Sequence, residues 1–455
     1  MQLRVRDVLK NKDFTPVQIL AIGYASIIFL GAVLLTLPIS SKNGNATPFL
    51  DSLFTSTSAV CVTGLVTVDT GTYWSYFGKT IIMLLIQVGG LGFMAFATML
   101  SLIAGKKITL RQRLIMQESM NSSSLQGIVK LAKYILLFTF SIEGLGALLL
   151  STQFIPIFGP IKGIYYSVFH AVSAFCNAGF DLMGNYSSLI GYSGNVVIII
   201  TISALIVIGG LGFIVWNEIY TYKVRKRLSL HSKVVISMTT FLILGGTVLF
   251  FIFEYSNPGT MKAMGLKERL LSSLFASVSP RTAGFNSIDL SKLTVPSIFL
   301  MIILMFIGGS PGSTAGGIKT STAGILYMTV KSIINGREDT EIFKKRVNKD
   351  IVYKSFAITI IALGVLFTVT VLLAITQSAS GEPFESYVFE AASALGTVGS
   401  TLGLTQKLNS IGKIIIILTM YAGRVGALTL ILAIAINKKK KNLSIKYPED
   451  KILVG

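Results

Sequence analysis

Long apolar runs without charge alternate along the chain with short apolar runs and polar segments. The run 17–39 contains no charged residue and is long enough to cross about 30 Å of hydrocarbon. The next apolar run, 49–60, has only 12 residues, includes Asp51 and is too short to span a bilayer. We interpret it as a re-entrant half-helix. Another uncharged run, 80–105, completes the order span, half-helix, span.

The same order recurs three more times. Further spans are expected at 134–155, 193–217, 234–253, 294–330, 355–380 and 414–436, and further half-helices at 163–176, 268–278 and 384–395. The predicted fold class is an all-α polytopic membrane protein with eight transmembrane helices and four re-entrant half-helices. We expect an N-terminal segment, four tandem repeats with the links that precede them, and a C-terminal tail, bounded at 1–16, 17–105, 106–217, 218–336, 337–436 and 437–455.

A five-residue segment containing a glycine follows each short run, at 61–65, 176–180, 281–285 and 396–400. Each segment comes after the same lead-in, Phe-x-x-x-Ser, and the glycines recur every 105 to 115 residues. A period of this length indicates a repeated structural unit. The third copy has one residue fewer between its serine and its glycine.

These glycine segments are the candidate site. Non-helical backbone at membrane depth is stable only where it is buried or lines a wet cavity. Four such loops can meet around a pseudo-fourfold central pore, where backbone carbonyls replace the hydration shell of a cation. Each half-helix directs its partially negative C-terminal end at the same place. The candidate ligands are Val62, Thr63, Gly64, Asn177, Ala178, Gly179, Thr282, Ala283, Gly284, Thr397, Val398 and Gly399. The alternative, that the glycines only permit helix packing or turns, does not explain four equivalent copies.

The charge distribution predicts the orientation of the chain. Only 13% of the residues are charged, against about 25% in soluble proteins, and the net charge is +20. The basic clusters 106–113, 223–227, 344–349 and 438–441 lie in the links between repeats and in the tail. By the positive-inside rule, the links and both termini face the cytoplasm of a multi-pass plasma-membrane protein. This explains the net charge without nucleic acid, although the clusters could also bind lipid head groups or a partner.

Enzymatic classes find no support in the sequence. It contains no P-loop, no nucleophile–base constellation and no Cys/His metal spacing. The two cysteines both lie in glycine segments and provide no disulfide framework. His170, on a predicted half-helix, is interpreted as a hydrogen-bonded structural residue.

Two features of the later spans are unusual for membrane helices. The segment 306–319 is rich in small residues and contains Pro311, so a regular helix is expected to break there. Arg424 lies inside the last span, where a charge is costly and needs partners. The alternatives are a kinked, closely packed helix and an arginine that only holds neighbouring carbonyls in place.

Together with Gly-Gly-Leu-Gly-Phe at 89–93 and 209–213, these features resemble the membrane subunit of the Trk/Ktr/HKT superfamily of potassium transporters, most closely the bacterial Ktr type. The resemblance covers nearly the whole chain. In this superfamily, serine in place of the first-loop glycine accompanies a preference for sodium. The residue here is Gly64, so the resemblance implies potassium as the transported ion. Sodium as an activator is a trait of some members and is left open.

The resemblance also implies a gate and partners. The intramembrane loop that closes the path would comprise Gly309, Ser310, Gly312, Ser313, Thr314, Gly316, Gly317 and Lys319, with Arg424 beside it. Lys319 either joins this barrier or marks the end of its half-span. The implied assembly is a homodimer in the lipid bilayer, above a ring of cytosolic nucleotide-binding regulator subunits.

A secondary active carrier and a membrane scaffold are the two alternative classes of function. A secondary active carrier coupling a cation to another substrate often has inverted repeats with broken helices. All four repeats here share one orientation, which argues against a carrier. A membrane scaffold without transport would leave the four glycine loops unexplained.

Overall fold

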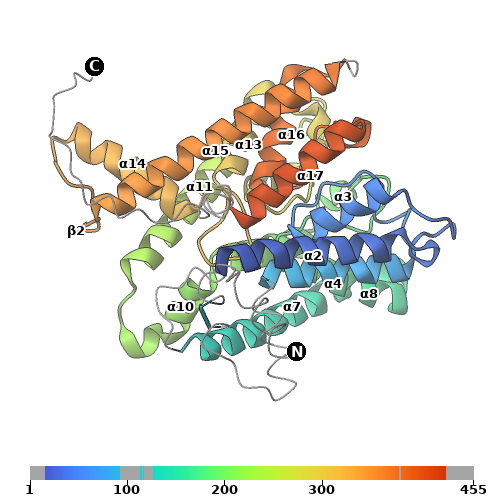
Figure 1. Ribbon diagram of the computed structural model, residues 1–455, viewed down its shortest axis with the longest axis horizontal. Coiled ribbons are helices and arrows are strands. Elements are labelled where there is room, and N and C mark those ends of the chain that lie inside the picture. The colour runs from blue at the N-terminus through green and yellow to red at the C-terminus, as the bar shows by residue number, and fades with distance from the viewer. Residues whose placement is uncertain (1–15, 93–112, 115, 117–126, 379–380, 427–455) are drawn as a thin grey trace, which may run out of the picture.

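The computed structural model describes residues 16–92, 113–114, 116, 127–378 and 381–426. Four groups of helices follow one another in the chain (Figure 1). They are α2 (Pro16–Thr36), α3 (Phe49–Val60) and α4 (Tyr76–Leu91); α7 (Ile128–Phe158), α8 (Pro160–Phe175), α9 (Val196–Gly210) and α10 (Phe213–Arg225); α11 (Leu230–Glu254), α12 (Leu266–Val278), α13 (Val295–Phe306) and α14 (Thr320–Ile334); and α15 (Lys349–Thr376), α16 (Phe384–Gly396) and α17 (Ser410–Val425).

Short elements complete the described part of the chain. Single 3-10 turns occur at Pro38–Ser40, Ile190–Tyr192, Leu290–Lys292 and Thr405–Lys407. A two-residue antiparallel pair, β1 (Glu341–Ile342) and β2 (Lys345–Arg346), lies between α14 and α15 with Glu341 opposite Arg346. This small hairpin is the exception to the predicted all-α class.

The four long helices α2, α7, α11 and α15 have the character of membrane spans. Each is long and apolar enough to cross a bilayer, yet only 22% to 33% of its most apolar window is buried. Large apolar side chains such as Leu137, Phe241 and Phe367 are 69% to 72% exposed. Such a surface is stable against lipid rather than water. The prediction of a helical polytopic membrane protein is confirmed.

The short helices α3, α8, α12 and α16 form the interior. The lead-in phenylalanines Phe54, Phe169, Phe275 and Phe389 are all 0% exposed. Each short helix also contacts the second span of a neighbouring group: α8 contacts α4, α12 contacts α9, α16 contacts α13 and α3 contacts α17. The last contact joins the first and the last group of helices in a closed cycle, and Figure 1 shows α3 beside α17.

The prediction of one continuous span at 193–217 was wrong. α9 and α10 meet at an angle of 96°, with Leu211 and Gly212 between them. The cause is the Gly-Gly-Leu-Gly sequence, because Gly212 adopts a φ of 92° that a helix cannot contain. In the predicted span 294–330, by contrast, the expected helix break is found: α13 and α14 are joined by the irregular segment 307–319, here called the α13–α14 loop.

The same break occurs at the ends of α4 and α17. Gly92 and Gly426 cap these helices with φ values of 82° and 93°. The glycines at 89–92 also permit close helix packing. A Cβ on Gly89 would indeed lie under 3.0 Å from the Val60 carbonyl oxygen, but the helix also ends there. The remainder of the predicted spans 80–105 and 414–436, most of the basic cluster 106–113, the N-terminal segment and the tail lie outside the described residues.

Candidate functional site

The four predicted glycines form a closed ring. A Cβ added to Gly64 would lie under 3.0 Å from the carbonyl oxygen of Ala178. The same relation links Gly179 to Ala283, Gly284 to Val398 and Gly399 to Thr63. Each glycine is therefore packed against the carbonyl just before the glycine of the next group, and the fourth returns to the first. Any side chain at these positions would enter the ring of carbonyls.

The backbone of the four glycine loops is irregular at two positions in each. The glycines have φ values between 71° and 95°. The residue two positions earlier is also left-handed in every copy, and these residues are Val62, Asn177, Thr282 and Thr397, with φ between 52° and 71°. A β-branched residue is rarely found in this region, so three of the four positions hold strained backbone. The sequence analysis missed this, because nothing in the residue types announces it.

The carbonyl oxygens of the twelve candidate residues differ in their hydrogen bonding from those of neighbouring loop residues such as Arg281, Phe180 and Phe285, which accept side-chain hydrogen bonds. Among the described residues, no backbone or side-chain hydrogen bond is donated to the carbonyl oxygen of any of the twelve candidate residues. Buried carbonyls in proteins are nearly always paired. A ring of buried carbonyls that accept no hydrogen bond from the described part of the protein can therefore accept an electropositive partner from outside it.

The lead-in serines hold the loops to the short helices. Gly64 and Gly399 donate their backbone N–H groups to the hydroxyls of Ser58 and Ser393, at 3.0 and 3.1 Å. In the other two groups the serine donates instead, Ser173 to the Phe180 carbonyl at 2.7 Å and Ser279 to the Phe285 carbonyl at 2.5 Å. One hydroxyl in each copy thus connects the helix to the loop.

The one-residue deletion in the third copy is absorbed by a tighter turn. The residue before each glycine donates its N–H to the serine carbonyl, at 2.8 Å for Thr63, Ala178 and Val398 and at 2.9 Å for Ala283. This bond spans five residues in three copies and four residues in the third. The shorter turn keeps Gly284 in register with the other glycines of the ring.

The α13–α14 loop is seated against the glycine loops. The hydroxyl of Thr314 donates to Asn177 Oδ1 and to the Phe175 carbonyl, both at 3.1 Å. A Cβ on Gly316 would lie 2.8 Å from the Gly396 carbonyl oxygen and even closer to the Thr397 hydroxyl. The α13–α14 loop therefore touches the second and the fourth glycine loops, which are separated from each other in the ring by the first and the third.

The break between α9 and α10 fixes the other side of this loop. Ser310 donates its N–H to the Gly210 carbonyl at 3.0 Å, and Phe213 donates to the Gly312 carbonyl at 2.9 Å. Within the loop, Gly309 donates to the Gly316 carbonyl at 3.3 Å, and Ser313 Oγ to the Ser310 carbonyl at 2.6 Å. Gly312 and Gly317 have positive φ values of 65° and 67°. The predicted gate residues therefore form one compact, internally bonded loop.

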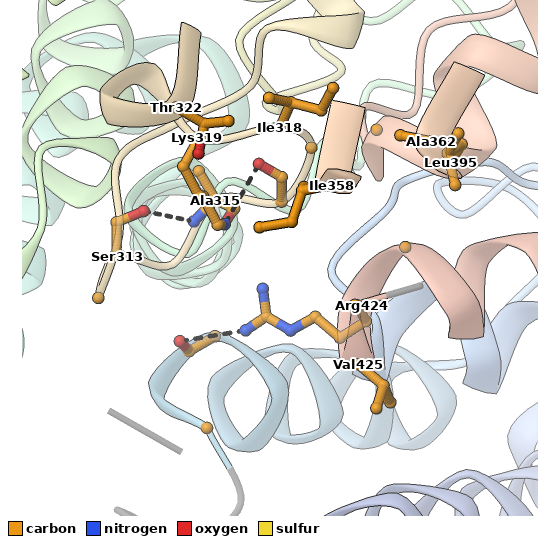
Figure 2. A pocket seen from close by; sticks show the side chains of 18 of the residues that line it. Ser313, Ala315, Ile318, Lys319, Thr322, Ile358, Ala362, Leu395, Arg424 and Val425 are labelled. Atoms are coloured by element: carbon orange, nitrogen blue, oxygen red, sulfur yellow. Dashed lines mark hydrogen bonds between the residues drawn. The ribbon is translucent and has the colours of Figure 1, made fainter. Parts of the chain in front are cut away.

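Arg424 and Lys319 line a cavity of about 430 Å³ beside this loop. Arg424 Nη1 donates to the Thr314 carbonyl at 2.6 Å, and Nη2 donates to the Gly89 carbonyl at the end of α4. Lys319 Nζ donates to the Ala315 carbonyl at 2.7 Å. Figure 2 shows the Arg424 side chain reaching across the cavity from α17, opposite the segment that carries Ala315 and Lys319.

The charged side chains described in the lining of the cavity are all basic. Its described lining includes the cations Lys319, Lys354 and Arg424 and no carboxylate. Arg424 replaces the second glycine of the Gly-Gly-Leu-Gly sequences in α4 and α9, since it lies between Gly423 and Gly426. The segment 423–426 is therefore a further copy of the sequence that ends α4 and α9, with a charged residue at its second position.

Comparison with known proteins identifies the family of the chain. The sequence matches the TrkH family, described as cation transport protein, over residues 15–445. It is 43% identical over 456 residues to the potassium/sodium uptake protein NtpJ of Enterococcus hirae, covering 100% of this chain and 99% of that protein. It is 42% identical to the Ktr system potassium uptake protein B of Bacillus subtilis, with both chains covered completely, at 100%.

A solved structure shares the fold. The potassium transporter TrkH from Vibrio parahaemolyticus superposes with a TM-score of 0.72 at 17% sequence identity, over 93% of this chain and 85% of that one. The resemblance to the Trk/Ktr group is confirmed, as is the prediction that the protein is not an enzyme. The chain belongs to the TrkH family of cation transport proteins.

Proposed function

We propose that the protein is the ion-translocating membrane subunit of a Ktr-type potassium uptake system. The observation that carries the proposal is the closed ring of glycine loops with unpaired carbonyl oxygens. Such oxygens replace the hydration shell of a dehydrated monovalent cation. The relatives from Enterococcus hirae and Bacillus subtilis are named as a potassium/sodium uptake protein and a potassium uptake protein, and potassium, which both names include, is therefore favoured as the ion.

The four glycine loops act as a selectivity filter in this proposal. The oxygens come from the three residues that end with each glycine, from Val62–Thr63–Gly64 in the first loop to Thr397–Val398–Gly399 in the last. The hydroxyls of Thr63 and Thr397 are also buried without a hydrogen-bond partner among the described residues. They add two oxygens to the candidate ligands. Gly64 and the other three ring glycines have no side chain, so potassium can reach the carbonyl oxygens of all four loops.

The α13–α14 loop and Arg424 act as the gate. The loop lies directly against the second and fourth glycine loops, so an ion leaving the filter must pass it. Arg424 bonds to the loop through Thr314 and to α4 through Gly89. These bonds support a latch that holds the loop, and the positive charge on the pathway adds an electrostatic barrier. Lys319 belongs to the same barrier, because it lines the same cavity.

The remaining features of the assembly follow as part of the proposal. The chain has four repeats with the bounds expected from the sequence, eight spans and cytoplasmic termini. It works as a homodimer in the plasma membrane, controlled by a cytosolic nucleotide-binding ring. Sodium, which the name of the Enterococcus protein includes, is an activator or a second substrate. A secondary active carrier is the rival function, and it would require the glycine ring to be structural.

The test is potassium uptake by cells that lack their own uptake systems. We would compare the wild type with Gly64→Ser at limiting potassium, with and without sodium and with a cytosolic regulator co-expressed. Gly245→Ser is the matched control, because a Cβ at Gly245 meets no atom within 4 Å. We expect the wild type and the control to restore growth, and Gly64→Ser to admit sodium or abolish uptake. A wild type that moves no potassium, or a Gly64→Ser variant with unchanged uptake, would contradict the proposal.

A further inference from the structure

The residue after each lead-in phenylalanine occupies an equivalent place in the four short helices. The four residues at this place are Thr55, His170, Ala276 and Glu390. Two of them are titratable, and both are 0% exposed. They come from α8 and α16, whose glycine loops alternate with the other two around the ring. Neither residue contacts the α13–α14 loop through any hydrogen bond in the described part of the chain.

Glu390 holds the segment that leaves the fourth glycine loop. Its Oε2 accepts a hydrogen bond from Thr401 Oγ1 at 2.7 Å, and its Oε1 accepts one from Thr405 Oγ1. The Thr401 hydroxyl in turn accepts the N–H of Gly403 at 3.1 Å. Thr401 comes two residues after Gly399. The carboxylate therefore ties the middle of α16 to the backbone that follows the fourth loop.

His170 performs the corresponding role in the second group. Its Nδ1 lies 2.7 Å from the Tyr166 carbonyl, an acceptor, so this nitrogen carries the proton. The Nε2 atom is then an acceptor, and it receives the N–H of Leu182 at 3.4 Å. Leu182 comes three residues after Gly179. The imidazole thus ties the middle of α8 to the backbone that follows the second loop.

The other two groups lack this tie. Ala276 has no polar side chain, and the buried hydroxyl of Thr55 has no hydrogen-bond partner among the described residues. The ring therefore has two braced loops and two loops without this brace, in alternation. A buried carboxylate bonded by two hydroxyls is a strong restraint, because losing a partner leaves it poorly solvated.

We infer that Glu390 and His170 are positioning residues that fix the second and fourth glycine loops and thereby set the discrimination between potassium and sodium. This inference rests on the proposed transport function. A carbonyl ring whose size selects the ion must resist contraction around sodium, the smaller of the two. Glu390 is the stronger of the two braces, because it holds two hydroxyls at short range.

The experiment compares Glu390→Ala, Glu390→Gln and His170→Ala with Thr55→Ala, which alters the equivalent place in an unbraced loop. The measurement is potassium uptake into proteoliposomes, with sodium as the competing ion, alongside the melting temperature of each purified protein. We expect Glu390→Ala to lower the potassium-to-sodium preference about tenfold, as for the loss of one charge-assisted hydrogen bond. Glu390→Gln keeps one acceptor oxygen and should lie in between. His170→Ala should have a smaller effect than Glu390→Ala, and Thr55→Ala none.

The readouts separate the possible failures. A preference equal to the wild type in a folded Glu390→Ala or Glu390→Gln protein overturns the inference. If Glu390→Ala does not fold, the Gln variant, which preserves the shape of the side chain, decides. An equal loss of preference in Thr55→Ala also overturns it, since any change behind the filter would then have the same effect. Absence of potassium uptake by the wild type and by Thr55→Ala counts against the proposed function itself.

Discussion

The hydroxyl of Thr314 donates to the side-chain oxygen of Asn177 at 3.1 Å, and so joins the α13–α14 loop directly to the second glycine loop. Asn177 is itself one of the left-handed residues of that loop, with a φ of 59°. Its Nδ2 faces the Arg281 carbonyl at 3.4 Å, which connects the second glycine loop to the third. A displacement of the α13–α14 loop must therefore break this bond or move the second glycine loop with it.

Loss of this contact should loosen the gate. We predict that Thr314→Val, which keeps the side-chain shape but removes the hydroxyl, raises potassium flux through the isolated membrane subunit by about threefold to tenfold, as expected for a lost buried hydrogen bond. Flux into proteoliposomes without a regulator measures this. Thr368→Val is the control, because among the described residues the Thr368 hydroxyl bonds only to the Gly364 carbonyl of its own helix. Equal flux in the two variants would show that the contact does not restrain the loop.

Arg424 allows the latch and the barrier to be distinguished. Arg424→Gln removes the charge and most of the hydrogen bonds, and we expect potassium flux to rise about tenfold or more. Arg424→Lys keeps the charge but lacks the planar fork that reaches both Thr314 and Gly89. A flux near the wild-type value in the lysine variant identifies the charge as the main restraint, and a flux near that of Arg424→Gln identifies the latch. The gate assignment fails if neither variant changes the flux.

The buried lead-in phenylalanines should carry much of the stability of the interior. Phe169 is 0% exposed, whereas Phe367 is 71% exposed on the outer face of α15. We predict that Phe169→Ala destabilises the protein by about 3–5 kcal/mol, because it leaves a cavity in the core. Phe367→Ala should change the stability by less than about 1 kcal/mol. Thermal unfolding of the two variants in the same detergent compares them, and similar losses would refute the assignment of the short helices to the core.

The sequence predicted a helix well where the length and the polar borders of an apolar run determine both of its ends. The run 49–60 coincides with α3, because its length and its polar borders determine both ends. The 96° break after α9 was missed, because Gly-Gly-Leu-Gly in an apolar run is equally compatible with close packing and with a helix end. Gly212 permits the turn, and the neighbouring Gly312 carbonyl, which accepts the Phe213 N–H, is a partner from another part of the chain that the local sequence does not show.

Within the candidate site, residue identity predicted the glycines but not their neighbours. A glycine signals unusual backbone, whereas Val62 and Thr397 give no such signal and are held left-handed by their surroundings. Glu390 was passed over for a related reason. A single acidic residue in a short apolar run has no periodic pattern, and its partners Thr401 and Thr405 come from the far side of the loop.

The closed ring of glycines has a consequence for biosynthesis. Its last contact joins Gly399 to the carbonyl of Thr63, residues separated by most of the chain. The first three groups can enter the membrane as they leave the ribosome, but the ring stays open on one side until the fourth group arrives. A nascent or prematurely terminated chain that lacks the fourth group therefore cannot close the carbonyl ring, however well its first three groups are folded.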